Sequence, residues 1–190
     1  MKTLINKITG QWSAVGIIDK TDEDIYEYGL DLLLYTILNL TVVLCSAALA
    51  GKMAESIALL VVILPLQSIG GGYHAKTHLR CFLIMYIAWW IVILLLPLVT
   101  PIYALVIAIS TMFIVFNLAP IANENVKMSA NQMLKMRKIV RVVVSLVVLV
   151  SVICLFSIYR RIGLTMSTGL GAYSLSMLIA HAKNKLKVAH

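Results

Sequence analysis

Residues 53–98 read MAESIALLVVILPLQSIGGGYHAKTHLRCFLIMYIAWWIVILLLPL, and this stretch decides the fold. Two apolar runs, 53–69 and 81–98, flank a short polar segment that is rich in glycine and histidine. Each run is close to the ~20 residues that a helix needs to cross a ~30 Å hydrocarbon layer. Because their side chains are apolar on every side, the runs predict membrane-spanning helices and not strands.

Four more runs of this kind extend the prediction to the whole chain. They cover residues 30–50, 102–119, 142–159 and 162–180. Of the 190 residues, 61% are hydrophobic and 13% are charged, whereas a soluble domain carries ~25% charged residues. We therefore predict an all-α integral membrane protein with six transmembrane helices. It forms a single polytopic domain over 1–190, with an N-terminal region at 1–29, the membrane region at 30–180 and a tail at 181–190.

The N-terminal region is polar and carries five acidic side chains, so we expect no signal peptide. Within it, residues 1–18 predict an amphipathic helix that lies in the membrane interface. Its apolar positions are Leu4, Ile5, Ile8, Trp12 and Val15. A cytosolic helix that packs on the loops is the alternative.

Lysine and arginine residues are distributed unevenly among the loops. With the N-terminus in the cytosol, the segments on that side carry 13 of the 16 bases and the opposite segments carry 3. Short loops rich in these residues stay in the cytosol. Both termini and segment 70–81 are therefore predicted to face the cytosol. Orientation in the bilayer also explains the net charge of +8, so nucleic acid is not expected as a partner.

Cys81 stands at the cytosolic end of its predicted span. It falls in the first turn of that helix, where free N–H groups carry partial positive charge. Lys76 and Arg80 add positive charge, which favours the nucleophilic thiolate, and we assign both to substrate binding. Cys45 and Cys154 lie among apolar neighbours in other spans and are predicted to be buried.

A cysteine nucleophile needs a base, and two histidines lie near Cys81. His74 is seven residues before Cys81, a separation that an unbroken helix would turn into ~10 Å along its axis. Three glycines at 70–72 directly precede this region and predict a bend that brings His74 back towards Cys81. His78, three residues before Cys81, is the rival base.

Polar residues on two other spans are candidates for supporting roles. Asp31, at the cytosolic edge of the first span, could orient the histidine or hold its imidazolium. Gln67, at the end of the second span, could donate a hydrogen bond to a developing oxyanion. The backbone N–H groups of Gly71 and Gly72 could do the same.

The last span carries small residues at intervals of four, which predict a close-packing face. The two ridges are Gly163, Ser167, Gly171 and Ala172, Ser176, Ala180. Packing inside the molecule is favoured over a homodimer through this face.

The polar segment also offers a competing chemistry. His74, His78 and Cys81 have spacings of four and three, so a continuous helix would align them as zinc ligands, with Asp31 as a fourth. The protein would then be a metal-binding membrane protein or a small transporter. The glycines and the lack of a C-x-x-C pair argue against this, so we expect neither a metal nor another cofactor.

Residues 71–81 contain a pattern that is similar to a known one. Gly71-Gly72-Tyr73-His74-Ala75, followed after five residues by Cys81, resembles the G-G-x-H-A-x(5)-C signature of the accessory gene regulator B (AgrB) family. The similarity extends to the size of the chain, its six apolar runs, the stretch 25–30 and Ala119-Pro120. The family commonly has an arginine where this chain has Gln67, which puts in doubt a charge contact there with an acidic substrate tail.

The resemblance implies a cysteine endopeptidase of the bacterial cell membrane that faces the cytosol. It implies that Cys81 is the nucleophile and His74 the base. The partner implied is an amphipathic precursor of a quorum-sensing signal peptide. The enzyme would remove its C-terminal tail and yield a cyclic lactone or thiolactone.

Overall fold

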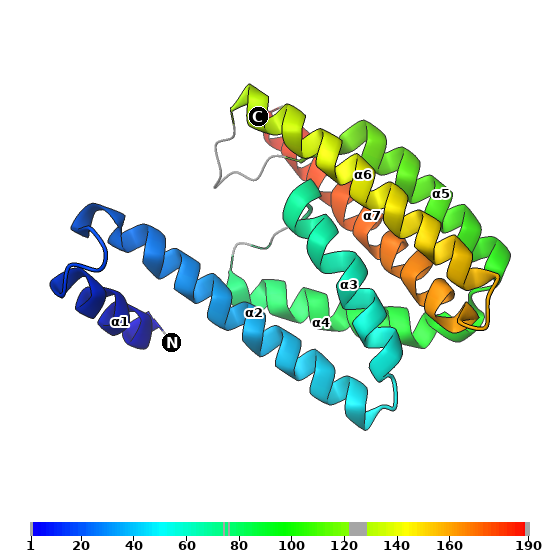
Figure 1. Cartoon of the computed structure of the whole chain (residues 1–190), viewed down its shortest axis with the longest axis horizontal. Coiled ribbons are helices and arrows are strands. Elements are labelled where there is room, and N and C mark those ends of the chain that lie inside the picture. Colours follow the sequence, from blue (N-terminus) through cyan, green and yellow to red (C-terminus); the bar gives the residue numbers. More distant parts are fainter. Residues whose placement is uncertain (1, 74, 76, 122–128, 189–190) are drawn as a thin grey trace.

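The computed structural model describes residues 2–73, 75, 77–121 and 129–188, and in these residues the chain is helical with no strand. Its α-helices are α1 (Lys2–Ala14), α2 (Glu23–Leu49), α3 (Met53–Gly70), α4 (His78–Leu95), α5 (Pro101–Leu118), α6 (Ala130–Leu155) and α7 (Arg160–Val188). Two single 3₁₀ turns, η1 (Lys20–Asp22) and η2 (Leu96–Leu98), lie before α2 and after α4. Figure 1 shows their arrangement.

Six of the helices in the described part of the chain, α2 to α7, are long and apolar enough to cross a membrane. This confirms the six predicted runs, although several helices start earlier than their apolar stretch. The helix of the first run begins at Glu23, and α6 begins at Ala130 behind a Ser129–Gln132 capping box. Polar end turns of this kind lengthen a helix beyond the hydrocarbon layer.

Large apolar side chains cover the outside of these helices. Leu94, Phe113, Val142 and Ile153 are each more than half exposed. A soluble monomer rarely shows such extended apolar surface. Together with the lengths of the helices, this exposure defines a multi-pass membrane protein.

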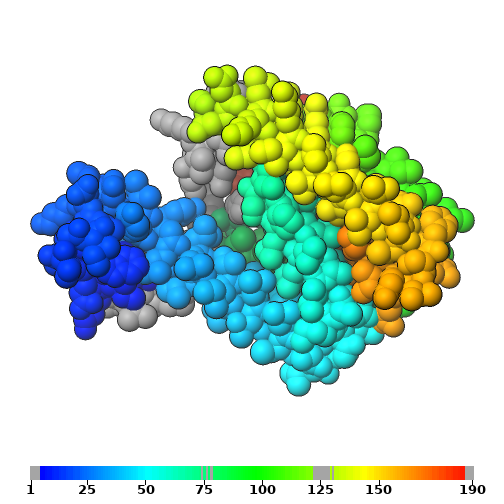
Figure 2. Space-filling model, in the orientation of Figure 1, coloured from blue at the N-terminus to red at the C-terminus, as the bar shows by residue number. Residues whose placement is uncertain are grey.

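Helix α7 forms the centre of a bundle with α3, α5 and α6. Figure 2 shows α3 and α6 side by side on one face of this bundle. The buried cluster draws residues from all four helices, namely Val62, Leu66, Ala108, Val115, Val140, Val144, Met166, Leu170, Tyr173 and Met177.

The small residues of α7 serve this internal packing, as predicted. Gly163 lies against the backbone near the end of α6, where an added Cβ would be 2.8 Å from the Ser151 carbonyl oxygen. The hydroxyls of Ser151 and Ser167 are 2.7 Å apart. An added Cβ on Gly171 would lie 2.8 Å from the Ile107 side chain of α5.

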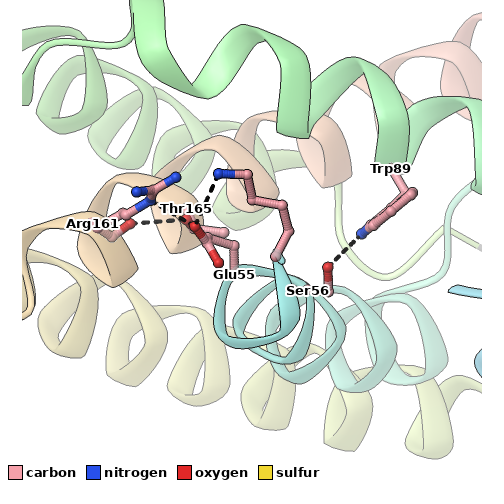
Figure 3. A network of polar contacts seen from close by, with 6 residues as sticks. Glu55, Ser56, Trp89, Arg161 and Thr165 are labelled. Carbon is pink, nitrogen blue, oxygen red and sulfur yellow. Dashed lines mark hydrogen bonds and ion pairs between the residues drawn. The ribbon is translucent and has the colours of Figure 1, made fainter. Parts of the chain in front are cut away.

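A second cluster joins α2 and α4 to α3. Its buried residues are Val43, Ala47, Leu59, Trp89, Val92 and Ile93. The Trp89 indole N–H donates to the Ser56 hydroxyl at 2.9 Å (Figure 3). The first half of α2 extends away from the bundle and carries α1 alongside it (Figure 1).

Helix α1 confirms that the N-terminal region is helical. It packs against the start of α2, where the Thr9 hydroxyl donates to Glu27 at 3.3 Å and the Ile5 side chain is buried. Val15, which was expected on the apolar face, lies beyond the end of α1 and is exposed. The position of α1 in a membrane interface stays a prediction.

Glu55 holds the starts of α3 and α7 together at the end of the bundle opposite Gly70 (Figure 3). Its carboxylate is 2.6 Å from Arg161 Nε and 4.0 Å from Lys52 Nζ. Two of the three bases that were assigned to the outer segments are therefore paired with one buried carboxylate. The Glu55 side chain is 7% exposed, whereas that of Arg161 is 61% exposed.

This asymmetry predicts unequal effects of removing either partner. Arg161→Gln leaves a buried carboxylate with only a distant lysine, and is expected to cost about 3 kcal/mol of stability. Glu55→Gln leaves an exposed guanidinium that water can solvate, and is expected to cost about 1 kcal/mol. Thermal unfolding in detergent compares the two variants, with Arg160→Gln, which removes the exposed arginine next to Arg161, as the control. Equal losses for Glu55→Gln and Arg161→Gln would contradict this explanation.

Candidate functional site

The polar segment between α3 and α4 breaks the helix, as the glycines predicted. Helix α3 ends at Gly70, and the helix that carries Cys81 begins only at His78. The described residues between them, 71–73, 75 and 77, are not helical. The helix that carries Cys81 therefore does not continue back through these described residues to α3. His74 and Lys76 themselves lie outside the described residues.

Two glycines make the break possible. Gly71 has φ +74° and ψ −177°, a backbone conformation that is essentially restricted to glycine. An added Cβ on Gly71 would also strike the carbonyl oxygen of Ile121. At Gly70 an added Cβ would collide with the Tyr173 hydroxyl and lie 2.8 Å from Val140 Cγ2. Gly70 and Gly71 therefore lie in close contact with α6, α7 and the segment that follows α5.

Residues 119–121 are hydrogen-bonded to the end of α3, where the helix breaks. The Ile121 N–H donates to the Gly70 carbonyl oxygen at 3.0 Å. The segment itself is held by α6, because Arg137 Nε donates to the Ala119 carbonyl at 3.2 Å. Arg141 donates to the Phe116 carbonyl at 2.8 Å and lies over the Phe116 ring. Arginines that bind the last carbonyls of a helix stabilise its C-terminal end.

Cys81 lies where the sequence predicted it, in the first turn of α4. Thr77 caps this helix: its Oγ1 accepts from the Arg80 N–H at 3.4 Å, and its carbonyl oxygen accepts from the Cys81 N–H at 3.0 Å. The Cys81 side chain is half-buried, and Arg80 is exposed. His78 is the first residue of α4. The thiol therefore sits at the positive end of a helix and is not sealed inside the protein.

One prediction about the other cysteines is wrong. Cys45 is exposed on α2 and not buried, and Cys154 is half-buried. A thiol behaves as a small hydrophobic group, so an outward position on a membrane-spanning helix suits it as well as a core position.

The structure brings Gln67 and Gly72 together. An added Cβ on Gly72 would be 3.6 Å from Gln67 Cγ and 3.8 Å from its Nε2. Asp31 is half-buried and lies in the third turn of α2, which begins at Glu23. Asp31 on α2 and Cys81 on α4 come from helices outside the four-helix bundle.

Several residues that shape this site were not predicted from local sequence patterns. The Tyr73 N–H donates to Ser176 Oγ at 2.9 Å, and Lys183 Nζ lies 5.3 Å from the centre of the Tyr73 ring. Ser176 was singled out only as a small residue for helix packing. Contacts between residues more than 100 positions apart leave no local pattern in a single sequence.

The metal alternative stays open. Among the described residues, no group of three His, Cys, Asp or Glu side chains is placed to hold a metal ion. His74 lies outside those residues, so the proposed ligand set His74, His78 and Cys81 is not tested.

Taken together, the apolar helices and the broken segment define a multi-pass membrane protein with a cysteine at the start of a helix beside a glycine-rich bend. The chain belongs to the accessory gene regulator B (AgrB) family, whose model matches residues 1–180. No curated protein and no solved structure matches it. Membership of this family associates the protein with the accessory gene regulator quorum-sensing system.

Proposed function

We propose that the protein is a membrane-embedded cysteine endopeptidase that cleaves the precursor of a quorum-sensing peptide. Cys81 is the nucleophile and His74 is the base. The observation that carries this proposal is the helix break between Gly70 and His78. Because of this break, a new helix starts just before Cys81. The described residues before His78 do not follow the helical spacing, which would keep the His74 and Cys81 side chains apart.

The first chemical step forms a thioester. The Cys81 thiolate attacks the scissile carbonyl carbon, the peptide C–N bond breaks, and the His74 imidazolium gives its proton to the departing amine. The N-terminal part of the substrate is then bound to Cys81 as an acyl-enzyme.

The second step releases the product. A thiol or hydroxyl inside the bound peptide loses its proton to His74 and attacks the thioester carbonyl. The bond to Cys81 Sγ breaks, the Cys81 thiolate is regenerated, and a cyclic thiolactone or lactone leaves. Water in place of this internal nucleophile would give a linear acid, so exclusion of water favours the ring.

The oxyanion that forms in both steps needs hydrogen-bond donors. Gln67 Nε2 and the backbone N–H groups of Gly71 and Gly72 are the proposed donors. The close approach of the Gln67 side chain to Gly72 supports this assignment.

We further propose that this site faces the cytosol. The 13-to-3 distribution of bases supports this orientation. Arg137, Arg141 and Lys183 also contact the end of the bundle that carries the glycine segment. Lys76 and Arg80 would bind the acidic part of an amphipathic precursor that approaches along the inner leaflet.

The test uses purified protein in lipid vesicles and a candidate precursor, an amphipathic peptide with an internal cysteine or serine and an acidic tail. The expected products, identified by mass spectrometry, are a released C-terminal tail and a cyclic peptide lighter than its linear acid by one water. Elemental analysis of the same preparation is expected to find no stoichiometric metal. Bound metal without any cleavage would favour the metal-binding alternative and overturn the proposal.

A further inference from the structure

The glycine segment runs alongside the second half of α7. Three contacts follow in the same order along the segment and along α7: Gly70 lies against Tyr173, the Tyr73 N–H donates to Ser176, and the Tyr73 ring lies next to Lys183. The residues of α7 lie at intervals of three and seven, which places them on one side of the helix. This side of α7 therefore supports the segment from Gly70 to Tyr73.

Ser176 makes the one contact of the three that fixes the direction of a peptide group. Its Oγ accepts a 2.9 Å hydrogen bond from the Tyr73 N–H. The same oxygen would be 3.0 Å from a Cβ on Gly72, so a side chain there would require a small shift of the segment or of Ser176. The bond joins positions 103 residues apart, and loss of its acceptor would leave a partly buried N–H without a partner.

Tyr73 directly precedes His74 in the sequence. We infer that Ser176 is a positioning residue of the proposed peptidase: it holds the Gly72–Tyr73 peptide and so sets the course of the chain that leads to His74. This inference rests on the proposed function for the role of the histidine. Neither the composition of α7 nor the family match assigns Ser176 such a role.

Ser174 offers a matched control on the same helix. Its hydroxyl donates to the Gly171 carbonyl of its own helix at 2.9 Å. Ser174→Ala and Ser176→Ala therefore remove the same atom from the same helix, but only Ser176→Ala releases the glycine segment. Lys183→Gln, a change near the end of α7, loosens the Tyr73 ring and provides a second variant that does not rely on Ser176→Ala folding.

The readout is the alkylation rate of Cys81 by iodoacetamide in a Cys45→Ala, Cys154→Ala background. A histidine that pairs with the thiol accelerates this reaction, and it needs no peptide substrate. We expect Ser176→Ala to slow it about tenfold, because a displacement of ~1 Å can lower a rate by up to a hundredfold. We expect Lys183→Gln to slow it about threefold, and Ser174→Ala to match the parent.

A double variant separates positioning from general damage. If Ser176 acts through His74, adding Ser176→Ala to His74→Gln slows alkylation no further. In cleavage assays Ser176→Ala should lower kcat about tenfold with KM within about twofold. Equal alkylation rates for Ser176→Ala and Ser174→Ala, or losses that multiply in the double variant, would overturn the inference. If Cys81 of the parent protein is alkylated rapidly but the parent cleaves no peptide, this result would instead count against the proposed function.

Discussion

Replacing Cys81 with alanine is expected to abolish cleavage of the precursor peptide, with a loss of at least ~10⁴-fold in kcat/KM. Losses of this size follow removal of the nucleophile in other covalent peptidases, because the acyl-enzyme can no longer form. Cys81→Ser should retain almost none of the activity, since a serine hydroxyl beside the same base is a far weaker nucleophile. Both losses are measured as initial rates of tail release in vesicles.

The two remaining cysteines provide the controls. Cys45→Ala and Cys154→Ala remove thiols from α2 and α6, away from the glycine segment, and are expected to leave kcat/KM within about twofold. The acyl-enzyme offers a positive test: rapid acid quenching should leave the N-terminal part of the peptide on the tryptic fragment that contains Cys81. Cleavage that persists in Cys81→Ala would show that this thiol is not the nucleophile.

Gly71→Ala is expected to lower activity at least ~100-fold while the helical content of the protein stays unchanged. Alanine at φ +74° and ψ −177° is strained by about 1–3 kcal/mol. Its Cβ would in addition strike the Ile121 carbonyl oxygen. The glycine segment must move to relieve this strain and this collision. Small displacements of a catalytic group lower the reaction rate by large factors.

Substitutions at two other glycines distinguish the effect of backbone strain from the effect of the collision. Gly51 has φ +63° with open space around its Cβ position, so Gly51→Ala tests the strain of a positive φ without a collision. Gly29 lies inside α2 with open space, and Gly29→Ala should stabilise the helix by about 1 kcal/mol. Circular dichroism and cleavage rates on all three variants are compared. Full activity of Gly71→Ala would contradict the role assigned to the bend.

Much of this architecture follows from local sequence. The six spans are apolar on all sides over lengths that match a bilayer, so their number could be predicted from hydropathy alone. The break before Cys81 could be predicted because consecutive glycines permit conformations that other residues avoid. The start of α6 could not, because a polar turn at Ala130 continues this helix outside its apolar run.

The residues that surround the site could not be predicted from the sequence. Ser176, Tyr173 and Ile121 meet the glycine segment only through tertiary packing, and small or apolar residues of these types fill most of a membrane bundle. Long-range contacts, and not residue types, determine these positions.

The proposed chemistry depends on the proximity of position 74 to Cys81, which lies seven positions further along the chain. The most direct measurement of this proximity is disulfide formation in His74→Cys, with Cys45 and Cys154 replaced by alanine, after mild oxidation in vesicles. A disulfide requires Cα atoms within about 7 Å, and Ser151→Cys with Ser167→Cys, whose hydroxyls are 2.7 Å apart, serves as the linked control. We predict an intramolecular disulfide between positions 74 and 81, mapped by mass spectrometry. Its absence while the control pair is fully linked would contradict the account.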